Sequence, residues 1–182
     1  MDRTGTERQT IVRTATVEDI PRVAALAAQL VRLHHALDPL RFIIFEPIEP
    51  GYGRYLREQL DAAEAVILVA VEPADDGGER IVGYCFGRTE ERDWVALRDA
   101  CGVLHDVLVD ASARRLGVAE QLVRAMCEAL RAKGAPRVVL MTAALNEGAQ
   151  ALFRKLGFRS TMVEMTRESE PAHPPPDETR AR

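Results

Sequence analysis

The sequence predicts one α/β domain, of the α+β kind, with a mixed central sheet of six to seven strands and about four helices. Its length of 182 residues suits a single domain with a sizeable core. In the first half, consecutive strands are separated by turns, and such strands pair antiparallel. The second half alternates strands with helices, which is typical of parallel pairing.

The N-terminal third predicts one short strand and two helices. Residues Gln9 to Thr14 alternate as a strand does. Thr16 precedes a helix and Asp19 follows three residues later, the spacing of a capping box. The apolar face of this helix consists of Ile20, Val23, Ala24, Ala27, Leu30 and Val31. A second helix is expected from Gly53 to Glu64.

A hairpin and a fourth strand are predicted in the middle of the chain. Ala65–Glu72 and Ile81–Gly87 are apolar runs on either side of PADDGGER, which has the composition of a turn. Residues 88–100 fit either a strand extension or a loop. The valine-rich residues 103–110 (VLHDVLVD) predict the fourth strand.

The C-terminal part alternates helices and strands. An amphipathic helix begins near Ala119 and ends at Gly134, where glycine stops a helix readily. A fifth strand is expected at Arg137–Leu145. Asn146 then caps a further helix, which ends at Gly157.

A last strand at about Ser160–Arg167 is expected to complete the domain, which spans residues 10–168. Residues 1–9 are expected to be a flexible N-terminus. Residues 169–182 are rich in proline and charge, so we expect a disordered tail.

Composition excludes several classes of protein. The net charge of −4 argues against a general nucleic-acid binder. No stretch has the roughly 18 consecutive apolar residues of a membrane span, and the first ten residues lack the apolar region of a secretory signal. Three widely spaced cysteines predict a reduced, cytoplasmic protein. The four histidines show no metal-binding pattern, so no metal site is expected.

Two arginines and a glycine open the helix that follows the fourth strand, in the stretch SARRLGVAEQ. A helix N-terminus offers unpaired backbone N–H groups and the positive end of the helix dipole. It can therefore bind phosphate, and neighbouring arginines add charge-assisted hydrogen bonds. An ordinary solvated helix entry is the alternative interpretation of Arg114 and Arg115.

The stretch RRLGVA (114–119) resembles the acyl-CoA signature of the GNAT superfamily of N-acetyltransferases. Three further segments resemble the family in the right order: VRTATVEDIPRVAAL at the start, VLVDAS before the signature, and NEGAQALFRKLGF after it. Together they extend from Ile11 to Arg167. In VLVDAS, Ala111 stands where the family usually has proline.

The resemblance implies a GNAT fold, splayed between the fourth and fifth strands, and acetyl-CoA as co-substrate. It assigns the pyrophosphate of coenzyme A to Arg114, Arg115, Leu116, Gly117, Val118 and Ala119. It places the pantetheine arm beside Val107, Leu108 and Val109, with Asn146 and Phe153 as further contacts. Asn146 also fits the role of a helix cap.

The resemblance further implies direct attack of a primary amine on the thioester, with a base that removes the amine proton. His105 stands on the fourth strand where many members carry a base, and its ordinary titration range suits proton removal near neutrality. Asp106 would point to the opposite face of a regular strand. The alternative is that His105 is only a hydrogen-bonded strand histidine.

The chain departs from the family at Phe153, which occupies the place of the usual tyrosine, the proton donor to the coenzyme A thiolate. Phenylalanine has no hydroxyl, so Tyr84, Cys85 or a water would have to replace it. A non-catalytic acyl-CoA-binding or regulatory domain is therefore the alternative function. A nucleotide-binding protein is a remoter one, since no GxxxxGK[ST] motif is present.

The expected partner is a small-molecule or peptide amine, with no nucleic acid and no membrane, and a homodimer is compatible with the family. The acceptor side is expected at residues 31–55 and 88–102. Acidic residues there favour a cationic amine: Glu46, Glu49, Glu90, Glu91 and Asp93. Arginines partly cancel that charge: Arg41, Arg54 and Arg92.

Overall fold

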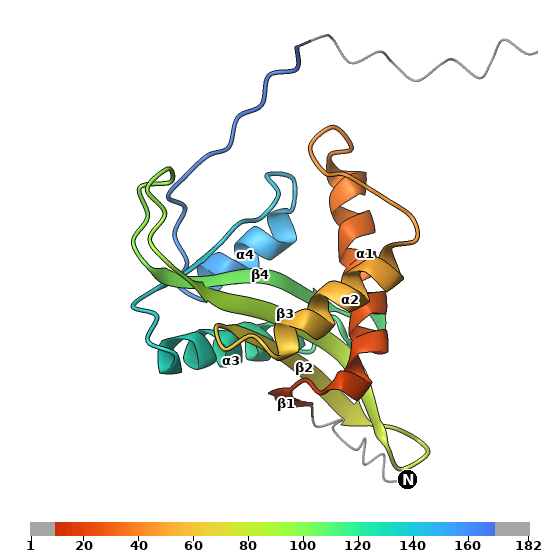
Figure 1. The fold of residues 1–182 in the computed structure, drawn as a ribbon. Coiled ribbons are helices and arrows are strands. Elements are labelled where there is room, and N and C mark those ends of the chain that lie inside the picture. Colours follow the sequence, from red (N-terminus) through yellow and green to blue (C-terminus); the bar gives the residue numbers. More distant parts are fainter. Residues whose placement is uncertain (1–9, 170–182) are drawn as a thin grey trace, which may run out of the picture.

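The computed structural model describes residues 10–169 as one sheet with helices on both faces (Figure 1). The predicted flexible segment 1–9 lies outside the described residues, as does the predicted tail except for residue 169.

The described strands form a single five-stranded sheet whose order follows the chain. Its strands are β1 (Ile11–Thr14), β2 (Ala65–Pro73), β3 (Glu79–Glu90), β4 (Cys101–Val109) and β5 (Val138–Leu140). The first four pair antiparallel, and β4 pairs with β5 in parallel. The mixed pairing is as predicted, but the strand count is five rather than six to seven.

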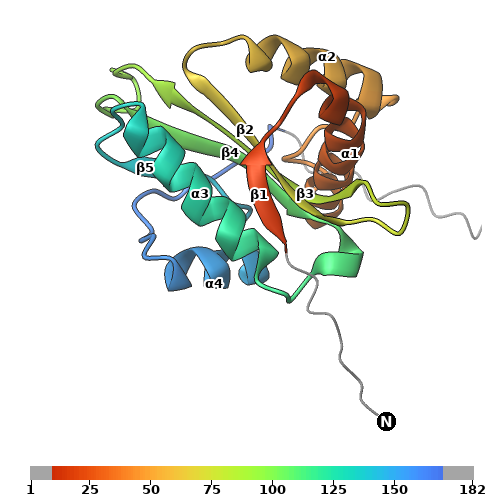
Figure 2. The same ribbon diagram turned by 90° about the horizontal axis from the view of Figure 1, so that it is seen from below.

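Four α-helices lie in two layers, one on each face of the sheet (Figure 2). The helices α1 (Ile20–Leu37) and α2 (Ile48–Leu60) cover one face, and α3 (Val118–Ala132) and α4 (Glu147–Lys155) cover the other. Each layer encloses its own cluster of buried apolar side chains.

The capping box predicted before α1 is present. The Asp19 carboxylate accepts a hydrogen bond from the Thr16 N–H at 2.7 Å, and a short 3-10 helix (Val17–Asp19) leads into α1. Arg13 of β1 also binds this carboxylate, at 2.7 Å. The start of α1 is therefore tied to the sheet.

Helix α2 begins at Ile48, five residues before the predicted start at Gly53. Pro50 lies in the first turn, where a helix tolerates a missing N–H. Gly53 faces α1 so closely that a Cβ atom there would lie 3.3 Å from the Cβ atom of Ala24. The glycine that suggested a helix start thus allows the two helices to pack together.

The predicted last strand at Ser160–Arg167 is wrong, since this stretch contains no strand. After α4 the chain runs extended, toward the connection between α1 and α2 (Figure 1). There the Glu164 carboxylate binds the Arg41 guanidinium, with Nη2 to Oε2 at 3.0 Å. This ion pair joins the segment to the α1–α2 connection.

Candidate active site

The strands β4 and β5 part after three residue pairs. Their pairing ends at Leu104 and Leu140, although β4 continues to Val109. The strand β5 is therefore shorter than the predicted Arg137–Leu145. The wedge that opens beyond Leu104 is the splay implied by the family resemblance.

Two backbone donors of β4 face this wedge. The Asp110 N–H donates to the Val82 carbonyl on the β3 side, at 2.8 Å. Because backbone groups of a strand alternate between its two neighbours, the N–H groups of Val107 and Val109 point the other way. On that side β5 has already ended, so a ligand can take these hydrogen bonds.

The turn before α3 has the backbone geometry of an anion site. Gly117 adopts a left-handed φ of 81° as the N-cap of α3, and Arg115 is also left-handed with φ 63°. A Cβ atom on Gly117 would meet no other atom within 4 Å. The start of α3 is therefore open at Gly117, and the unpaired N–H groups of an open helix start can bind phosphate.

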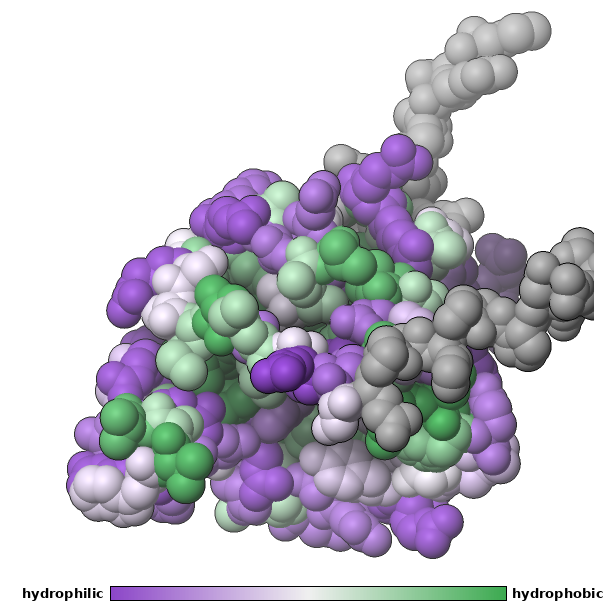
Figure 3. Space-filling model, turned by 90° about the horizontal axis from the view of Figure 1, so that it is seen from above, coloured by the Kyte–Doolittle hydropathy of each residue, from purple (hydrophilic) through white to green (hydrophobic). Residues whose placement is uncertain are grey.

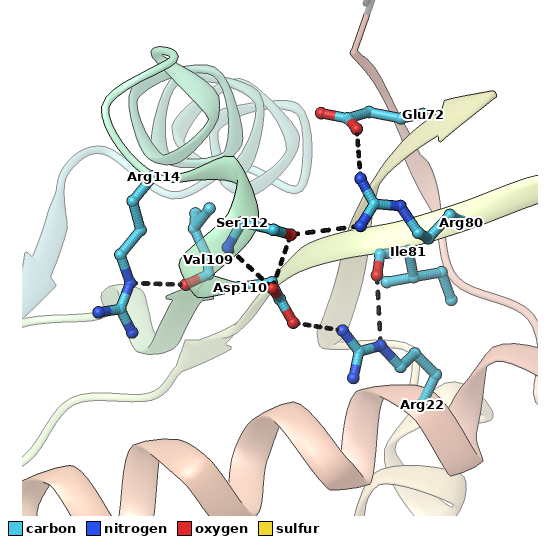
Figure 4. Close-up of polar contacts among 8 residues, drawn as sticks. All are labelled: Arg22, Glu72, Arg80, Ile81, Val109, Asp110, Ser112 and Arg114. Atoms are coloured by element: carbon cyan, nitrogen blue, oxygen red, sulfur yellow. Dashed lines mark hydrogen bonds and ion pairs between the residues drawn. The ribbon is translucent and has the colours of Figure 1, made fainter. Parts of the chain in front are cut away.

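A network of hydrogen bonds around Asp110 fixes the turn before α3 (Figure 4). The Asp110 carboxylate accepts from the Ser112 N–H at 3.0 Å and hydroxyl at 2.8 Å, and from Arg22 of α1 at 2.6 Å. These bonds lower the pKa of Asp110 to about 2. Arg80 donates to the Ser112 hydroxyl at 3.2 Å and to the carboxylate of the buried Glu72 at 2.8 Å.

Arg114 lies on the other side of the turn from Arg22 (Figure 4). Its Nε donates to the Val109 carbonyl at 3.2 Å, which places the guanidinium beside the wedge. Its Nη atoms have no hydrogen-bond partner among residues 10–169, nor does Arg115. Both cations can therefore bind an anion.

The other residues of the predicted pyrophosphate site differ in exposure. Leu116 is 62% exposed, Ala119 is half-buried, and the Val118 side chain is buried in the core. Only the backbone of Val118 is available to a ligand. Among the pantetheine neighbours, Val107 is half-buried and the side chains of Leu108 and Val109 are buried.

Asn146 and Phe153 have structural roles on α4. The Asn146 side chain accepts from the Ala149 N–H at 3.2 Å, so the predicted helix cap is present. Phe153 is 6% exposed and meets Phe158 edge-on, with ring centroids 5.8 Å apart. The substitutes considered for its missing hydroxyl, Tyr84 and Cys85, are fully buried and do not reach an open surface.

His105 is the extra residue of a β-bulge in β4. Phe86 pairs with Asp106 and Gly87 pairs with Leu104, so His105 has no partner on β3. The prediction that Asp106 faces away from His105 is wrong because of this bulge. Both side chains contact the α1–α2 side, because a bulge interrupts the alternation of the strand.

The His105 ring is held by β3. It stacks on Phe86 with ring centroids 5.3 Å apart, and its Nε2 lies 3.2 Å from Oε1 of Glu90. The Glu90 carboxylate also binds Arg98. The imidazole is therefore oriented and partly exposed, as a proton acceptor must be.

Beside His105, a buried cluster surrounds Asp106, which is only 9% exposed. The hydroxyl of Tyr52 on α2 donates to its Oδ2 at 2.5 Å, and that of Tyr84 on β3 donates at 3.1 Å. Burial raises the pKa of Asp106, while both hydrogen bonds lower it. Burial lowers the pKa of His34 on α1, while the negative charge of Asp106 raises it.

Sequence reasoning missed Tyr52 because it lies before the predicted start of the second helix. The alternating strand pattern likewise hid the bulge. The Pro-Gly-rich stretch before Gly53 gave no signal that an aromatic hydroxyl would reach β4.

A surface hollow of about 490 Å³ lies next to Glu90, lined by Glu64, Arg88, Thr89, Glu90 and Glu91. Three segments project at this end of the molecule: the α1–α2 connection, the β3–β4 hairpin tip and the stretch after α4 (Figure 1). From above, this face mixes hydrophobic and hydrophilic residues (Figure 3). Exposed apolar residues on the three segments include Ile43, Phe45, Trp94, Val95, Met162 and Val163.

Within residues 10–169 no cluster of His, Cys, Asp or Glu side chains could hold a metal ion. In the same range, no helix is both long and apolar enough to cross a membrane.

The sequence pattern of the Acetyltransferase (GNAT) family matches residues 30–158 of the chain. No curated protein sequence matches it significantly.

Several solved structures have the same fold. A tetramutant of the BH1408 protein from Bacillus halodurans is 22% identical with a TM-score of 0.72, over 87% of this chain and 99% of that chain. The aminoglycoside N-acetyltransferase AAC(6')-Iy in complex with CoA is 19% identical with a TM-score of 0.69, over 91% and 99%. Glucosamine-6-phosphate N-acetyltransferase from Arabidopsis thaliana is 16% identical with a TM-score of 0.62, over 89% and 99%.

Proposed function

The chain belongs to the GNAT family of acetyltransferases, and we propose that it transfers the acetyl group of acetyl-CoA to a primary amine, which attacks the thioester directly. The observation that carries this proposal is the open turn before α3 at the mouth of the β4–β5 wedge. It combines a left-handed glycine, two unpaired cations and a helix N-terminus at one place.

The residues at this turn fit coenzyme A. The N–H groups that follow Gly117, with Arg114 and Arg115, would hold the pyrophosphate. The Val109 N–H would bind a carbonyl oxygen of the pantetheine arm along the wedge. Exposed Met141, directly after β5, offers an apolar surface for its aliphatic part. When bound, acetyl-CoA supplies a thioester carbonyl that an amine nitrogen attacks, forming the C–N bond as the C–S bond breaks.

We assign proton removal from the amine to His105. Its Nε2 lies beside Glu90, which fixes the ring and stabilises the positive charge that the ring gains. The Val107 N–H, which faces the wedge near His105, is our candidate donor to the carbonyl oxygen. Glu90 also lines the surface hollow, and we propose that the amine approaches the imidazole from there.

The acceptor is proposed to be a cationic amine. Of the predicted acidic residues, Glu46 and Glu49 are both paired with Arg32. Glu91 makes no ion pair with residues 10–169 and lines the hollow. The neighbours named as aminoglycoside and glucosamine-6-phosphate N-acetyltransferases support an amine acceptor.

A screen of amines with acetyl-CoA, followed by the release of free thiol, tests the proposed function. His105→Gln is the control, because it should bind coenzyme A equally and turn over more slowly. Calorimetry with acetyl-CoA and with ATP accompanies the screen. Heat with ATP alone would indicate a nucleotide-binding protein and refute the proposal.

A second candidate function is a non-catalytic acyl-CoA-binding or regulatory domain. It is favoured by Phe153, which lacks the hydroxyl of the family's usual proton donor and is buried against Phe158. Coenzyme A binding without turnover of any amine would decide for this alternative.

A further inference from the structure

Asp106 is a buried carboxylate for which the proposed reaction has so far no use. It is 9% exposed and lies next to His105 in the β4 bulge. A buried charge is costly unless it is hydrogen-bonded, and such groups gather at functional sites. The two tyrosine hydroxyls that reach Asp106 come from different elements, α2 and β3.

We propose that Asp106 is a positioning residue for His105. Its carboxylate, held by Tyr52 and Tyr84, joins α2 to the bulge of β4 and stabilises the positive charge that His105 gains when it accepts the amine proton. The proposal rests on the proposed function, because it acts through the base of that reaction.

The position of His105 depends on the geometry of the bulge in β4. A bulged strand bends, so its exact course depends on contacts that hold it. The Tyr52 hydroxyl lies 2.5 Å from Oδ2 of Asp106, and the Tyr84 hydroxyl lies 3.1 Å from the same atom. These bonds fix the residue directly after His105 against both the helix layer and the sheet.

The charge of Asp106 also acts on His105. The charges of His105 and Asp106 attract when the imidazole is protonated, and this attraction lowers the pKa of Asp106. In a buried site such an attraction is stronger than in water. An ionised Asp106 therefore favours proton transfer to His105, whereas a protonated Asp106 does not.

The hydrogen bonds to Asp106 oppose the effect of its burial. Burial raises its pKa, and the hydrogen bonds from the two tyrosines are the largest effects that lower it. The titratable groups around Asp106 are His34 on α1, Tyr52 and Tyr55 on α2, Tyr84 and Cys85 on β3, and His105 on β4. Around His105, Glu90 and its partner Arg98 complete the set.

The test is the pH dependence of kcat/KM in Tyr52→Phe. Removing one hydrogen bond raises the pKa of Asp106, so the carboxylate becomes neutral at a higher pH than in the wild type. Loss of that charge makes the protonated His105 less stable, so the acid limb of the profile, where the base takes up its proton, should move to lower pH. At pH values where Asp106 is neutral, the imidazole is a weaker base, so proton removal from the amine slows and kcat should fall.

Tyr55→Phe is the matched control, since this tyrosine lies on the same helix but donates no hydrogen bond to Asp106. It should leave the acid limb in place. KM for acetyl-CoA should not change in Tyr52→Phe, because the cluster lies on the α1–α2 face. A purely structural role would instead lower the rate evenly at all pH values. An acid limb that coincides with the wild type, or moves equally in both variants, overturns the proposal.

A carboxyl carbon NMR titration of Asp106 needs no turnover. Its midpoint should rise in Tyr52→Phe and stay unchanged in Tyr55→Phe. If the wild type acetylates no amine, the proposed function fails, and this titration still shows whether the tyrosines hold Asp106 ionised. An unchanged midpoint in Tyr52→Phe refutes the cluster itself.

Discussion

Gly117→Ala should weaken coenzyme A binding by about 5- to 30-fold. Gly117 has a φ of 81°, and a left-handed backbone costs an L-residue about 1–2 kcal/mol. A Cβ atom there meets nothing within 4 Å, so no steric clash adds to this cost in the free protein. In the free variant the turn relaxes to relieve this strain. Coenzyme A binding must then restore the strained φ, and a cost of about 1–2 kcal/mol corresponds to a loss of affinity of about 5- to 30-fold.

Gly134→Ala provides the matched control at the other end of α3. Gly134 has a φ of 90° and equally free space around it, so its backbone cost is the same. Gly134→Ala should lower thermal stability and leave affinity unchanged, whereas Gly117→Ala, whose turn relaxes in the free protein, should cost less thermal stability and lower affinity in calorimetry with coenzyme A. Equal affinities in the two variants would refute the placement of the phosphate at this turn.

Four further outcomes are expected. Arg114→Ala should weaken coenzyme A binding by about 1.5–3 kcal/mol in calorimetry, whereas Arg124→Ala, whose guanidinium binds Glu120 on the helix surface, should not. His105→Gln should lower kcat about 10²-fold, with a smaller loss at high pH where the amine deprotonates unaided; an equal loss at every pH would argue against the base role. Phe153→Tyr should lower the melting temperature, because the added hydroxyl enters a buried site; an unchanged melting temperature would mean that the ring reaches solvent. Asp110→Asn should remove stability that is present above pH 3.8 and lost as the pH falls toward about 2, so acid unfolding curves should converge in that window.

Most of the fold could be predicted from local patterns. The capping box at Thr16, the hairpin around residues 73–78 and the amphipathic α3 each depend on neighbours in the sequence. The course of Ser160–Arg167 could not be predicted locally, because β-forming residues make a strand only where a partner strand is available to pair with them. In the structure this segment pairs with no strand, and Glu164 contacts Arg41 of the α1–α2 connection instead.

The candidate site also has a part that the local sequence predicts and a part that it does not. The turn at Arg114–Ala119 was predicted because its residues are contiguous and its chemistry is local to a helix start. The cluster around Asp106 brings together Tyr52 and Tyr84 from separate elements, and a one-residue bulge turns its side chain. Neither long-range hydrogen bonds nor a bulge has a signature in a single sequence.

The hydrogen bond between Arg22 and Asp110 has a thermodynamic consequence. Arg22 belongs to α1, and the turn that Asp110 stabilises begins α3 on the opposite face of the sheet. One of the hydrogen bonds that hold this turn therefore comes from the helix layer on the opposite face of the sheet. Ligand that binds this turn stabilises the native state by mass action, and through Arg22 that stabilisation extends to the distant layer. We expect the ligand-bound domain to melt in one cooperative transition, with α1 protected from hydrogen exchange as strongly as α3.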